Sequence, residues 1–478
     1  MDAQQGRARD SHAVDIASLA RQLREELATA DTLPVQLAGG CPIIIGEVGG
    51  LTRNVDPAEY DPHHVSIGPY HRIRNPDLAR DDEKIRSLGV VLSAASAGMT
   101  LEVYLDEMAR LEGQARSCYA HTFSIESNEF VRMLLLDGCY LLARFGDVDS
   151  GRHRNGAPAA NAHAKGGCQY HRSGAPLVSA PGGGDKLETI SVVRDVFYLA
   201  ENQIPFFVVN KIYQLTFLDS GVSAANAIAC DVRELLRRQL YSVAAPAVAE
   251  PPGPGNLLHL LHMHLKPTVH LSPTGDKVTG KLVGRWRTAT EYHFAGVKFK
   301  TRSLGSKEAR CVLDVKLDSG GGVLEIPRLN IDAETWRLLR NLMALEQHNP
   351  DTAGSNVTAY CVFMSQVACT AIDVDLLSRR GVIAHGLGNH GEVARCFADL
   401  CKGIVFRADD PDGNYLMATC QALEKRFRSR PRRWMAWLRQ KYFRNPWLAV
   451  GLAAAAVGLV CTVVQAVYSV LSYVQGAR

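Results

Sequence analysis

Long apolar stretches with helical spacing alternate with polar breaks along most of this chain. The segment Phe130–Phe145 (FVRMLLLDGCYLLARF) is almost continuously apolar, which is typical of a helix buried on all sides, with Asp137 and Gly138 at a point of close packing. A second apolar pattern covers Ile190–Leu215 and is interrupted at Pro205, where a regular helix has to break. These patterns predict helices at the centre of a globular body.

The second half of the chain shows shorter helical patterns. Asp332 is placed to cap a helix whose first turn holds Glu334. The apolar positions of that helix are spaced to form one core face, made of Leu338, Leu342 and Leu345. Two further segments have the pattern of helix ends, Asp373–Leu377 and Val393–Leu400.

Strand patterns are fewer and shorter. Gly296–Lys300 alternates between apolar and polar residues. Cys311–Leu317 is joined through a glycine-rich turn at 318–322 to Val323–Ile326, which predicts a β-hairpin. We therefore expect a mainly α fold with a small antiparallel β element, an α+β body.

The end of the chain is apolar in a different way. Between Arg444 and Arg478 there is no charged side chain, and within Trp447–Tyr468 only Thr462 and Gln465 are polar. A helix rises ~1.5 Å per residue, so this run is long enough to cross a hydrocarbon core ~30 Å thick. A buried core helix is the alternative, but soluble helices seldom stay uncharged beyond ~18 residues. We predict a single-pass transmembrane helix over 447–470.

The flanks of this helix differ in charge. Nine cations precede it (Lys425, Arg426, Arg428, Arg430, Arg432, Arg433, Arg439, Lys441 and Arg444), whereas Arg478 alone follows. This asymmetry predicts a tail-anchored protein whose bulk faces the cytosol. The residues expected to meet the lipid bilayer are Arg432, Arg433, Lys441, Arg444 and the interfacial Trp447. Gly451, Ala455 and Gly458 have helical spacing and raise the hypothesis of a homodimer through this helix.

Composition divides the chain into segments. Residues 150–186 are rich in Gly, Ala and Pro and are expected to be a disordered insertion, and 244–255 contains four prolines and is expected to be an exposed loop. Together with the helix pattern, this predicts the following organisation: an N-terminal polar segment and amphipathic helix at 1–39, a globular domain at 40–423, a basic juxtamembrane segment at 424–446, the transmembrane helix at 447–470, and a short tail at 471–478.

Overall charge and cysteine content exclude several classes. The net charge of the 478 residues is only +4 and the cations cluster beside the apolar helix, so a nucleic-acid partner is not expected. The 12 cysteines are scattered and include no Cys-x-x-Cys pair, which predicts reduced, packed thiols rather than disulfides or a zinc site.

Several segments of the chain carry distinctive motifs. The first is Tyr60–His71 (YDPHHVSIGPYH), followed by Asp81 and Lys84. The others are Met133–Leu142 (MLLLDGCYLL), Glu201–Phe207 (ENQIPFF), Arg340–Gln347 (RNLMALEQ) and Tyr442–Trp447 (YFRNPW). The motif residues that we carry forward as structural or interaction positions are Ser66, Gly68, Pro69, Tyr70, His71, Asp137, Gly138, Glu201, Asn202, Gln203, Pro205, Asn341, Glu346 and Gln347.

Together, these segments resemble a plant family named domain of unknown function 247. The resemblance implies a membrane-anchored plant protein without an assigned enzymatic activity. Some grass members of the family are associated with the pollen side of self-incompatibility, which implies recognition. No cofactor is implied.

The motifs contain residues that enzymes use as acids and bases. Glu201, Glu346, His64 and His71 are the best candidates, but their spacing matches no known catalytic constellation. Glu201–Gln203 is better interpreted as polar residues that satisfy backbone groups near the break at Pro205. In the segment LLHLLHMHL, His259 and His262 share a helix face whereas His264 points away, so a packing helix is favoured over a metal site.

Three functional hypotheses follow. The first is a non-enzymatic module that binds an unknown protein partner at the membrane. The second is the opposite orientation, with the body acting outside the cell as a recognition determinant, in which case Asn356-Val-Thr358 is a glycosylation acceptor. The third is an uncharacterised hydrolase or transferase that uses Glu201, Glu346 and a histidine.

Overall fold

The computed structural model describes residues 21, 43–96, 98–146, 186–218, 223–243, 253–268, 287–305, 309–407, 410, 413–428 and 446–476. Of the two units into which the chain divides, Met1–Cys41 and Pro42–Arg478, the second holds all of these residues except Arg21. Most of the predicted N-terminal helix, the 150–186 insertion, the 244–255 loop and the basic juxtamembrane segment lies outside the described residues.

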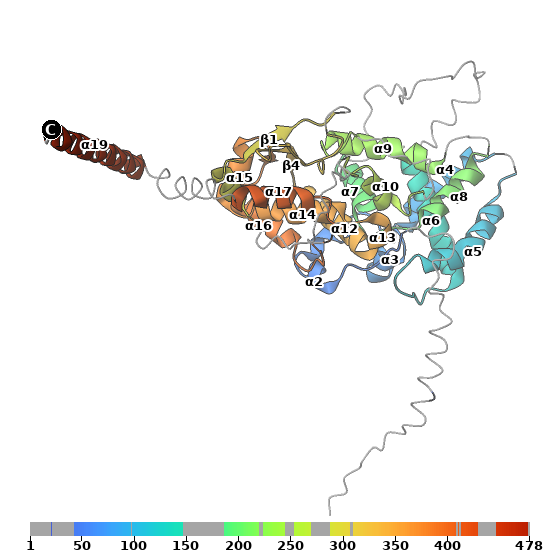
Figure 1. The fold of residues 1–478 in the computed structure, drawn as a ribbon. Coiled ribbons are helices and arrows are strands. Elements are labelled where there is room, and N and C mark those ends of the chain that lie inside the picture. The colour runs from blue at the N-terminus through green and yellow to red at the C-terminus, as the bar shows by residue number, and fades with distance from the viewer. Residues whose placement is uncertain are drawn as a thin grey trace, which may run out of the picture. The chain divides into compact units, whose positions relative to one another are not determined.

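The first part of the second unit is helical (Figure 1). Its helices are α2 (Gly50–Arg53), α3 (Pro69–Arg74), α4 (Asp81–Ala94), α5 (Leu101–Ser117), α6 (Ser127–Phe145), α7 (Lys186–Tyr198), α8 (Phe206–Thr216), α9 (Ala224–Arg238), α10 (Leu257–Met263) and α11 (Ala289–Phe294), with the 3₁₀ helices η1 (Pro57–Glu59) and η2 (Pro76–Ala79).

Helix α6 is the centre of this part, as its sequence predicts. It packs against α4, α5, α8 and α9, and every residue from Met133 to Leu142 is buried. Gly138 permits the close approach of α8, because a Cβ atom at this position would lie 2.4 Å from Cδ1 of Ile212. The polar Asp137 within this apolar helix belongs to the motif network described below.

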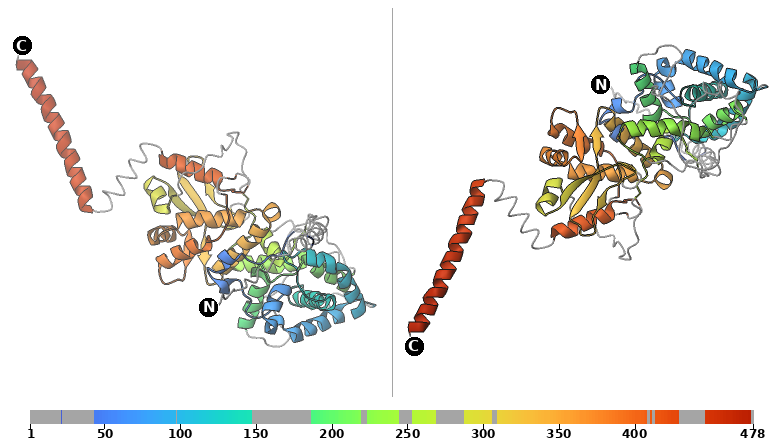
Figure 2. Two further views of the ribbon diagram at one scale, coloured as in Figure 1. Left: turned by 90° about the horizontal axis from the view of Figure 1, so that it is seen from below. Right: turned by 90° about the horizontal axis from the view of Figure 1, so that it is seen from above.

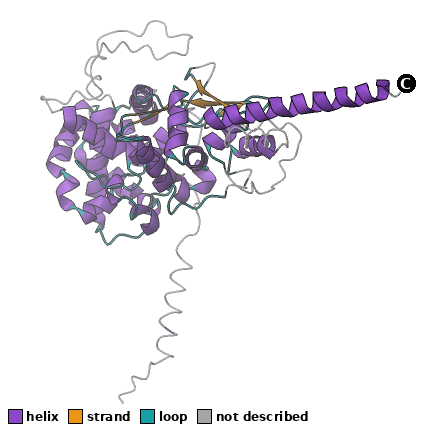
Figure 3. Cartoon of the chain, turned by 90° about the vertical axis from the view of Figure 1, so that its left-hand side faces the viewer, coloured by secondary structure: helices purple, strands orange, loops and turns teal. Residues whose placement is uncertain are grey.

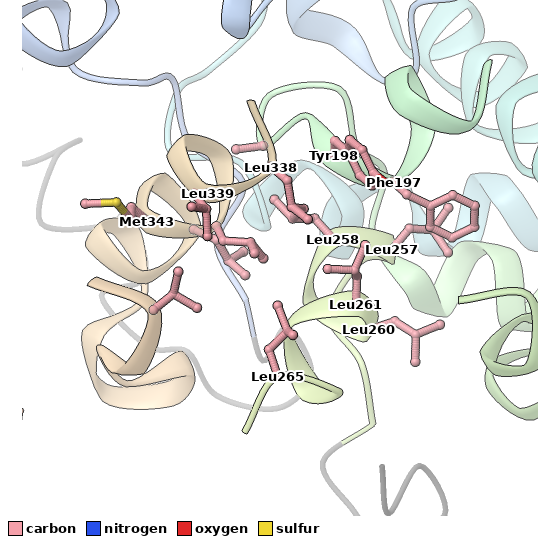
Figure 4. Packing of buried hydrophobic residues seen from close by; sticks show 14 of the residues in the cluster. Phe197, Tyr198, Leu257, Leu258, Leu260, Leu261, Leu265, Leu338, Leu339 and Met343 are labelled. Atoms are coloured by element: carbon pink, nitrogen blue, oxygen red, sulfur yellow. The ribbon is translucent and has the colours of Figure 1, made fainter. Parts of the chain in front are cut away.

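The predicted break at Pro205 separates α7 from α8, with Pro205 at the N-cap of α8. Helix α10 then packs between α7 and α12. Figure 4 shows Leu257 and Leu258 of α10 beside Phe197 and Tyr198 of α7 and Leu338 of α12. One continuous hydrophobic core therefore joins the early and late helices.

The later helices are α12 (Thr335–His348), α13 (Pro350–Ala353), α14 (Asn356–Val367), α15 (Ala371–Arg379), α16 (His390–Leu400), α17 (Met417–Arg428) and α19 (Pro446–Gly476). Helix α12 begins one residue after Glu334, which is its N-cap rather than part of its first turn. Asp332 Oδ1 accepts hydrogen bonds from the backbone N–H groups of Glu334 (3.1 Å) and Thr335 (2.9 Å), so it satisfies the start of the helix as predicted.

The strands are short and lie among the later helices (Figures 2 and 3). They are β1 (Lys298–Arg302), β2 (Lys316–Leu317), β3 (Val323–Pro327), β4 (Leu329–Ile331) and β5 (Ile383–His385), and they form sheets of order β1-β3-β2 and β4-β5. The mainly helical fold with a small β element is confirmed, as is the antiparallel pairing of β2 with β3.

Two details of the predicted sheet are wrong. Strand β1 pairs with β3 in parallel, with Phe299 opposite Leu324, and β4 pairs with β5 in parallel. Of the expected strand Cys311–Leu317, only Lys316–Leu317 pairs with β3. The buried Asp314 explains the difference: its carboxylate accepts backbone N–H groups of Arg310 (2.5 Å), Cys311 (3.2 Å) and Thr268 (2.6 Å), which curls the segment into a turn.

Helix α19 has 31 residues, and its 18-residue window Ala453–Val470 has a mean hydropathy of 1.9 with none of it buried. It is long and apolar enough to cross a membrane. Helices α14 and α15 pass a similar test only as a pair bent by 105°, and α14 contributes Tyr360, Phe363 and Met364 to the buried core.

The expectation that the cysteines are reduced is wrong at Cys118, which is disulfide-bonded. The other cysteines that the structure describes are free.

Candidate functional site

The family motifs meet around the corner between α7 and α8. Residues 201–203 of this corner contact the N-terminal segment 48–68, more than 130 positions earlier in the chain. We call these contacts, together with those of Asp137 and Asn341, the motif network.

Glu201 is the charged centre of the network and is 1% exposed. Its carboxylate accepts hydrogen bonds from the backbone N–H of Val48 (2.6 Å), from Arg53 Nη1 (3.0 Å to each oxygen) and from Arg74 Nη1. Each arginine also binds an outer carboxylate, since Arg53 pairs with Asp61 and Arg74 pairs with Glu47. Two guanidinium groups therefore clamp one buried carboxylate and fix α2 and α3 against the corner.

His71 lies beside this clamp. Its Nε2 is 3.7 Å from Glu201 Oε2 and its Nδ1 is 3.9 Å from Asp61 Oδ1. Burial, together with the positive charges of Arg74 and Arg53, lowers the pKa of His71 from 6.5 to about 3. The imidazole is therefore neutral at physiological pH, and these approaches are not salt bridges.

The next two motif residues bind backbone groups. Asn202 Oδ1 accepts from Ile67 N (2.6 Å), and its Nδ2 donates to Val65 O (3.0 Å). Gln203 Nε2 donates to the carbonyls of Val196 (2.8 Å) and Leu199 (2.9 Å). Carbonyls at the end of a helix such as α7 lack an intrahelical donor, and Gln203 supplies one. These are the contacts expected of polar residues beside a helix break.

A neighbouring carboxylate that we did not predict has a similar role. Asp195 is fully buried in α7 and accepts the backbone N–H groups of His63 (3.0 Å), His64 (2.6 Å) and Val65 (3.0 Å) through Oδ2. A single acidic residue inside the apolar run ISVVRDVFYL is the only sequence signal for it.

The Ser66–His71 part of the first motif passes directly over the corner. Gly68 has φ +75°, and a Cβ atom there would lie 2.4 Å from the carbonyl oxygen of Gln203. Pro69 begins α3, and the Tyr70 hydroxyl donates to Ile45 O (3.1 Å). Only glycine combines this backbone conformation with this approach.

Beneath this segment is a buried ion pair. Lys84 Nζ lies 2.5 Å from Asp137 Oδ1 and donates to Ser66 O (2.7 Å), while Gly68 N donates to Asp137 Oδ2 (2.7 Å). Both side chains have 0% exposure as residues. Lys84 thereby links the Ser66–Gly68 turn to α6.

The Arg340–Gln347 motif lies on α12. Asn341 Oδ1 accepts from Ala200 N (2.9 Å), and its Nδ2 donates to Glu59 O (2.9 Å), so it joins the motif network. Gln347 Oε1 accepts from Val405 N (3.1 Å). Asn349, two positions later and outside our prediction, exchanges two hydrogen bonds with the backbone of Ile44.

Glu346 forms a separate buried network. Its carboxylate accepts the backbone N–H groups of Val357 (2.9 Å) and Thr358 (2.8 Å) and the Thr358 hydroxyl (2.7 Å), and it lies 2.8 Å from His262 Nε2. Within the described chain, the side-chain hydrogen-bond and ion-pair partners of Glu201 differ from those of Glu346. The structure places His71 with Glu201 and His262 with Glu346, so it does not bring the catalytic candidates together.

The remaining histidines of the candidate set are also held by packing. His64 Nε2 lies 3.6 Å from Glu83 Oε2. On α10, His259 accepts from Gly255 N (3.1 Å), and burial lowers its pKa to about 3. His264 Nδ1 lies 2.9 Å from Leu260 O, and burial lowers its pKa to about 4. Within the described residues, no group of three or more His, Cys, Asp or Glu side chains is arranged to hold a metal ion.

A surface depression of about 670 Å³ lies beside α3 and α4. Its lining mixes arginines (Arg72, Arg80, Arg86) with acids (Asp77, Asp81, Asp82, Glu83, Glu129). Asp81 is held by Arg72 (2.9 and 3.0 Å) and Arg132 (2.6 Å), and the hydrogen bonds from these guanidinium groups lower its pKa to about 2. Neither Glu201 nor Glu346 lines this depression.

Of the predicted membrane-flank residues, Trp447 is described and is 82% exposed. Arg432, Arg433, Lys441 and Arg444 lie outside the described residues.

The chain combines a helical body that holds the motif network with an apolar C-terminal helix, so its class is that of helical proteins with one candidate membrane span. A family described as plant protein of unknown function, DUF247, matches residues 45–461, and the chain therefore belongs to this family. This confirms the resemblance drawn from the motifs.

Two similar proteins come from Arabidopsis thaliana. UPF0481 protein At3g47200 is 25% identical over 444 residues, which are 89% of this chain and 85% of that protein. Putative UPF0481 protein At3g02645 is 31% identical over 118 residues, which are 24% of this chain and 21% of that protein. No solved structure matches this chain.

Proposed function

We propose that this protein is a non-enzymatic, membrane-anchored module whose helical body binds another protein at the membrane surface. The observation that carries the proposal is α19, whose Ala453–Val470 window is apolar and has no buried residue. An apolar helix of this length that is not packed into a core is stable in a bilayer rather than in water.

The motif network supports a binding role over a catalytic one. The carboxylates of Glu201 and Glu346 are each saturated by arginine, histidine, threonine or backbone donors, which leaves neither placed to accept a substrate proton. A general base needs an accessible lone pair near the reacting proton. These glutamates instead organise the chain around them.

The network also presents two apolar side chains to solvent. Leu51 of α2 is 81% exposed and Val405 is 79% exposed. They lie on adjoining segments, because the Thr52 hydroxyl donates to Gly403 O (3.2 Å). Glu201 fixes α2 through Arg53, and Gln347 fixes the backbone of Val405. Large apolar side chains held outward on rigid supports are suited to contact a protein partner.

A crosslinking experiment on the full-length chain in native membranes tests this function. We expect the wild type to resist extraction by alkaline carbonate. We also expect the segments that contain Leu51 and Val405 to crosslink to one stoichiometric partner protein. A Leu51→Ser/Val405→Ser variant should lose the partner and keep carbonate resistance. A matched variant with Ile85→Ser, a 49% exposed apolar residue on α4, should keep both. Recovery of lipids and chaperones alone, in all three proteins, refutes the proposal.

The orientation of the body has two opposing arguments. The nine-cation flank favours the cytosol, whereas the disulfide of Cys118 favours an oxidising compartment and therefore the recognition hypothesis outside the cell. Protease protection with a tag at each end distinguishes them. Glycan occupancy at Asn356 is a second measurement, and it has to precede folding, because the Thr358 hydroxyl of the acceptor sequence is buried against Glu346.

A further inference from the structure

The outer face of the three-stranded sheet carries lysines. Side chains alternate along a strand, and in β1 Phe299 is buried whereas Lys298 and Lys300 are exposed. Glu325 of β3 lies opposite both Lys300 and Lys316, so the exposed Lys316 of β2 is on the same face. The side chain of Lys300 is 69% exposed. We call this surface, formed by the three lysines, the lysine face.

The acids beside the lysine face do not neutralise it. Glu325 Oε1 lies 3.5 Å from Lys300 Nζ and offsets one lysine charge. Asp318 accepts two backbone N–H groups of its own turn (2.6 Å each), and the nearby Arg426 of α17 offsets its charge. The three lysines and Arg426 against these two acids leave an excess of two positive charges.

The chain leaves the body for α19 next to the lysine face. Arg426 Nη1 donates to Gly320 O (2.9 Å) and its Nη2 donates to Gly296 O (3.2 Å), which fixes the end of α17 beside the start of β1. Helix α17 ends at Arg428 and α19 begins at Pro446, so 17 residues, 429–445, join them. Even a fully extended connection of this length spans only about 60 Å. The sheet therefore stays close to any bilayer that holds α19.

We propose that the lysine face lies against the anionic headgroup surface of the bilayer that holds α19. This rests on the proposed membrane anchoring. Anionic headgroups attract lysine side chains close to the surface, and the connection 429–445 adds six further cations that are attracted to the same leaflet. The anchor also raises the effective concentration of this surface at the face, so the lysines do not have to recruit the protein alone. The contact sets which side of the body faces the membrane.

Amine labelling of the full-length chain in lipid nanodiscs, read by mass spectrometry, tests the contact. The discs contain either phosphatidylcholine alone or phosphatidylcholine with phosphatidylserine. We expect Lys298, Lys300 and Lys316 to react roughly three- to tenfold more slowly in the anionic discs. Salt at about 1 M should remove the difference, because it screens exposed charges. Lys402, whose side chain is 62% exposed, should react equally in both.

A double variant tests whether the lysines act together. Lys298→Gln/Lys300→Gln removes two exposed charges and leaves the buried Phe299 in place, so Lys316 should lose most of its protection. The matched Lys402→Gln variant should keep the protection of Lys316.

The outcomes separate the contact from the anchoring. A carbonate-resistant wild type whose three lysines react equally in both kinds of disc overturns the contact alone, as does equal protection of Lys402. Protection that native membranes give and anionic discs do not indicates an acidic protein on the lysine face, and it also overturns the lipid contact. A wild type that alkaline carbonate extracts from native membranes overturns the anchoring, and the contact with it.

Discussion

The buried pair of Lys84 and Asp137 gives the sharpest test of how the motifs act. Replacing Lys84 by methionine keeps the length of the side chain and removes its charge. Among the described residues, the buried carboxylate of Asp137 then keeps the N–H of Gly68 as its hydrogen-bond donor, and the carbonyl of Ser66 loses the donor Lys84.

The size of the effect follows from burial. At 2.5 Å and an effective dielectric constant of ~20, the attraction between the two charges is about 7 kcal/mol, from which the cost of removing both from water is subtracted. Breaking one partner of a buried pair destabilises proteins by about 3–5 kcal/mol, so we expect Lys84→Met to lose stability in this range. The surface pair of Lys402 and Asp399 has a similar distance of 2.6 Å, but Lys402 is 62% exposed, and Lys402→Met should cost less than about 1 kcal/mol.

Thermal unfolding of the full-length chain in detergent, followed by tryptophan fluorescence, measures both variants against the wild type. The double variant Lys84→Met/Asp137→Leu should recover part of the loss, because it removes both charges. The Lys84–Asp137 pair does not stabilise the fold if Lys84→Met and Lys402→Met shift the unfolding temperature equally. The same conclusion follows if the shift for Lys84→Met corresponds to less than about 1 kcal/mol.

The remaining predictions concern His71, Gly68 and α19. His71 has a folded pKa of about 3 against an unfolded value of 6.5, so the unfolded chain binds more protons below pH 6.5 and stability falls with pH from 6.5 towards 3. His71 should account for about 2 kcal/mol of loss at pH 5, and a His71→Asn variant should show a shallower pH dependence in the same unfolding assay. Gly68→Ala should lower the free energy of unfolding by about 3 kcal/mol or more, because the added methyl group would lie 2.4 Å from Gln203 O. Gly354 has a similar φ of +72° but open space around it, so Gly354→Ala should lower the free energy of unfolding by about 1 kcal/mol. Similar losses for both variants would refute the steric argument. Removal of residues 446–478 should release the protein from vesicles in a flotation assay, and retention of the truncated chain would contradict anchoring by α19.

Sequence reasoning found the elements whose cause is local. The apolar run of α6, the break at Pro205 and the charge-free helix α19 each follow from residues within one segment. The parallel pairing of β1 with β3 and of β4 with β5 could not be found in this way, because it depends on the path of the crossover connections between the strands.

The candidate site was predictable in its residues but not in its partners. The ENQIPFF motif indicated polar side chains that serve a helix break, and Asn202 and Gln203 make such contacts. Arg53 and Arg74, which clamp Glu201, lie about 130 to 150 positions away and carry no local pattern. Asp195 was missed because a lone acid in an apolar helix has the same appearance whether it is buried or exposed.

The reach of the Asn349 contacts has a consequence for biosynthesis. Asn349 closes hydrogen bonds to Ile44 across 305 positions of sequence. At roughly 5–20 residues per second, a ribosome delivers Asn349 about 15–60 s after Ile44. The nascent N-terminal segment therefore waits without this partner for most of translation, and it is open to chaperones that shield extended chains during that time.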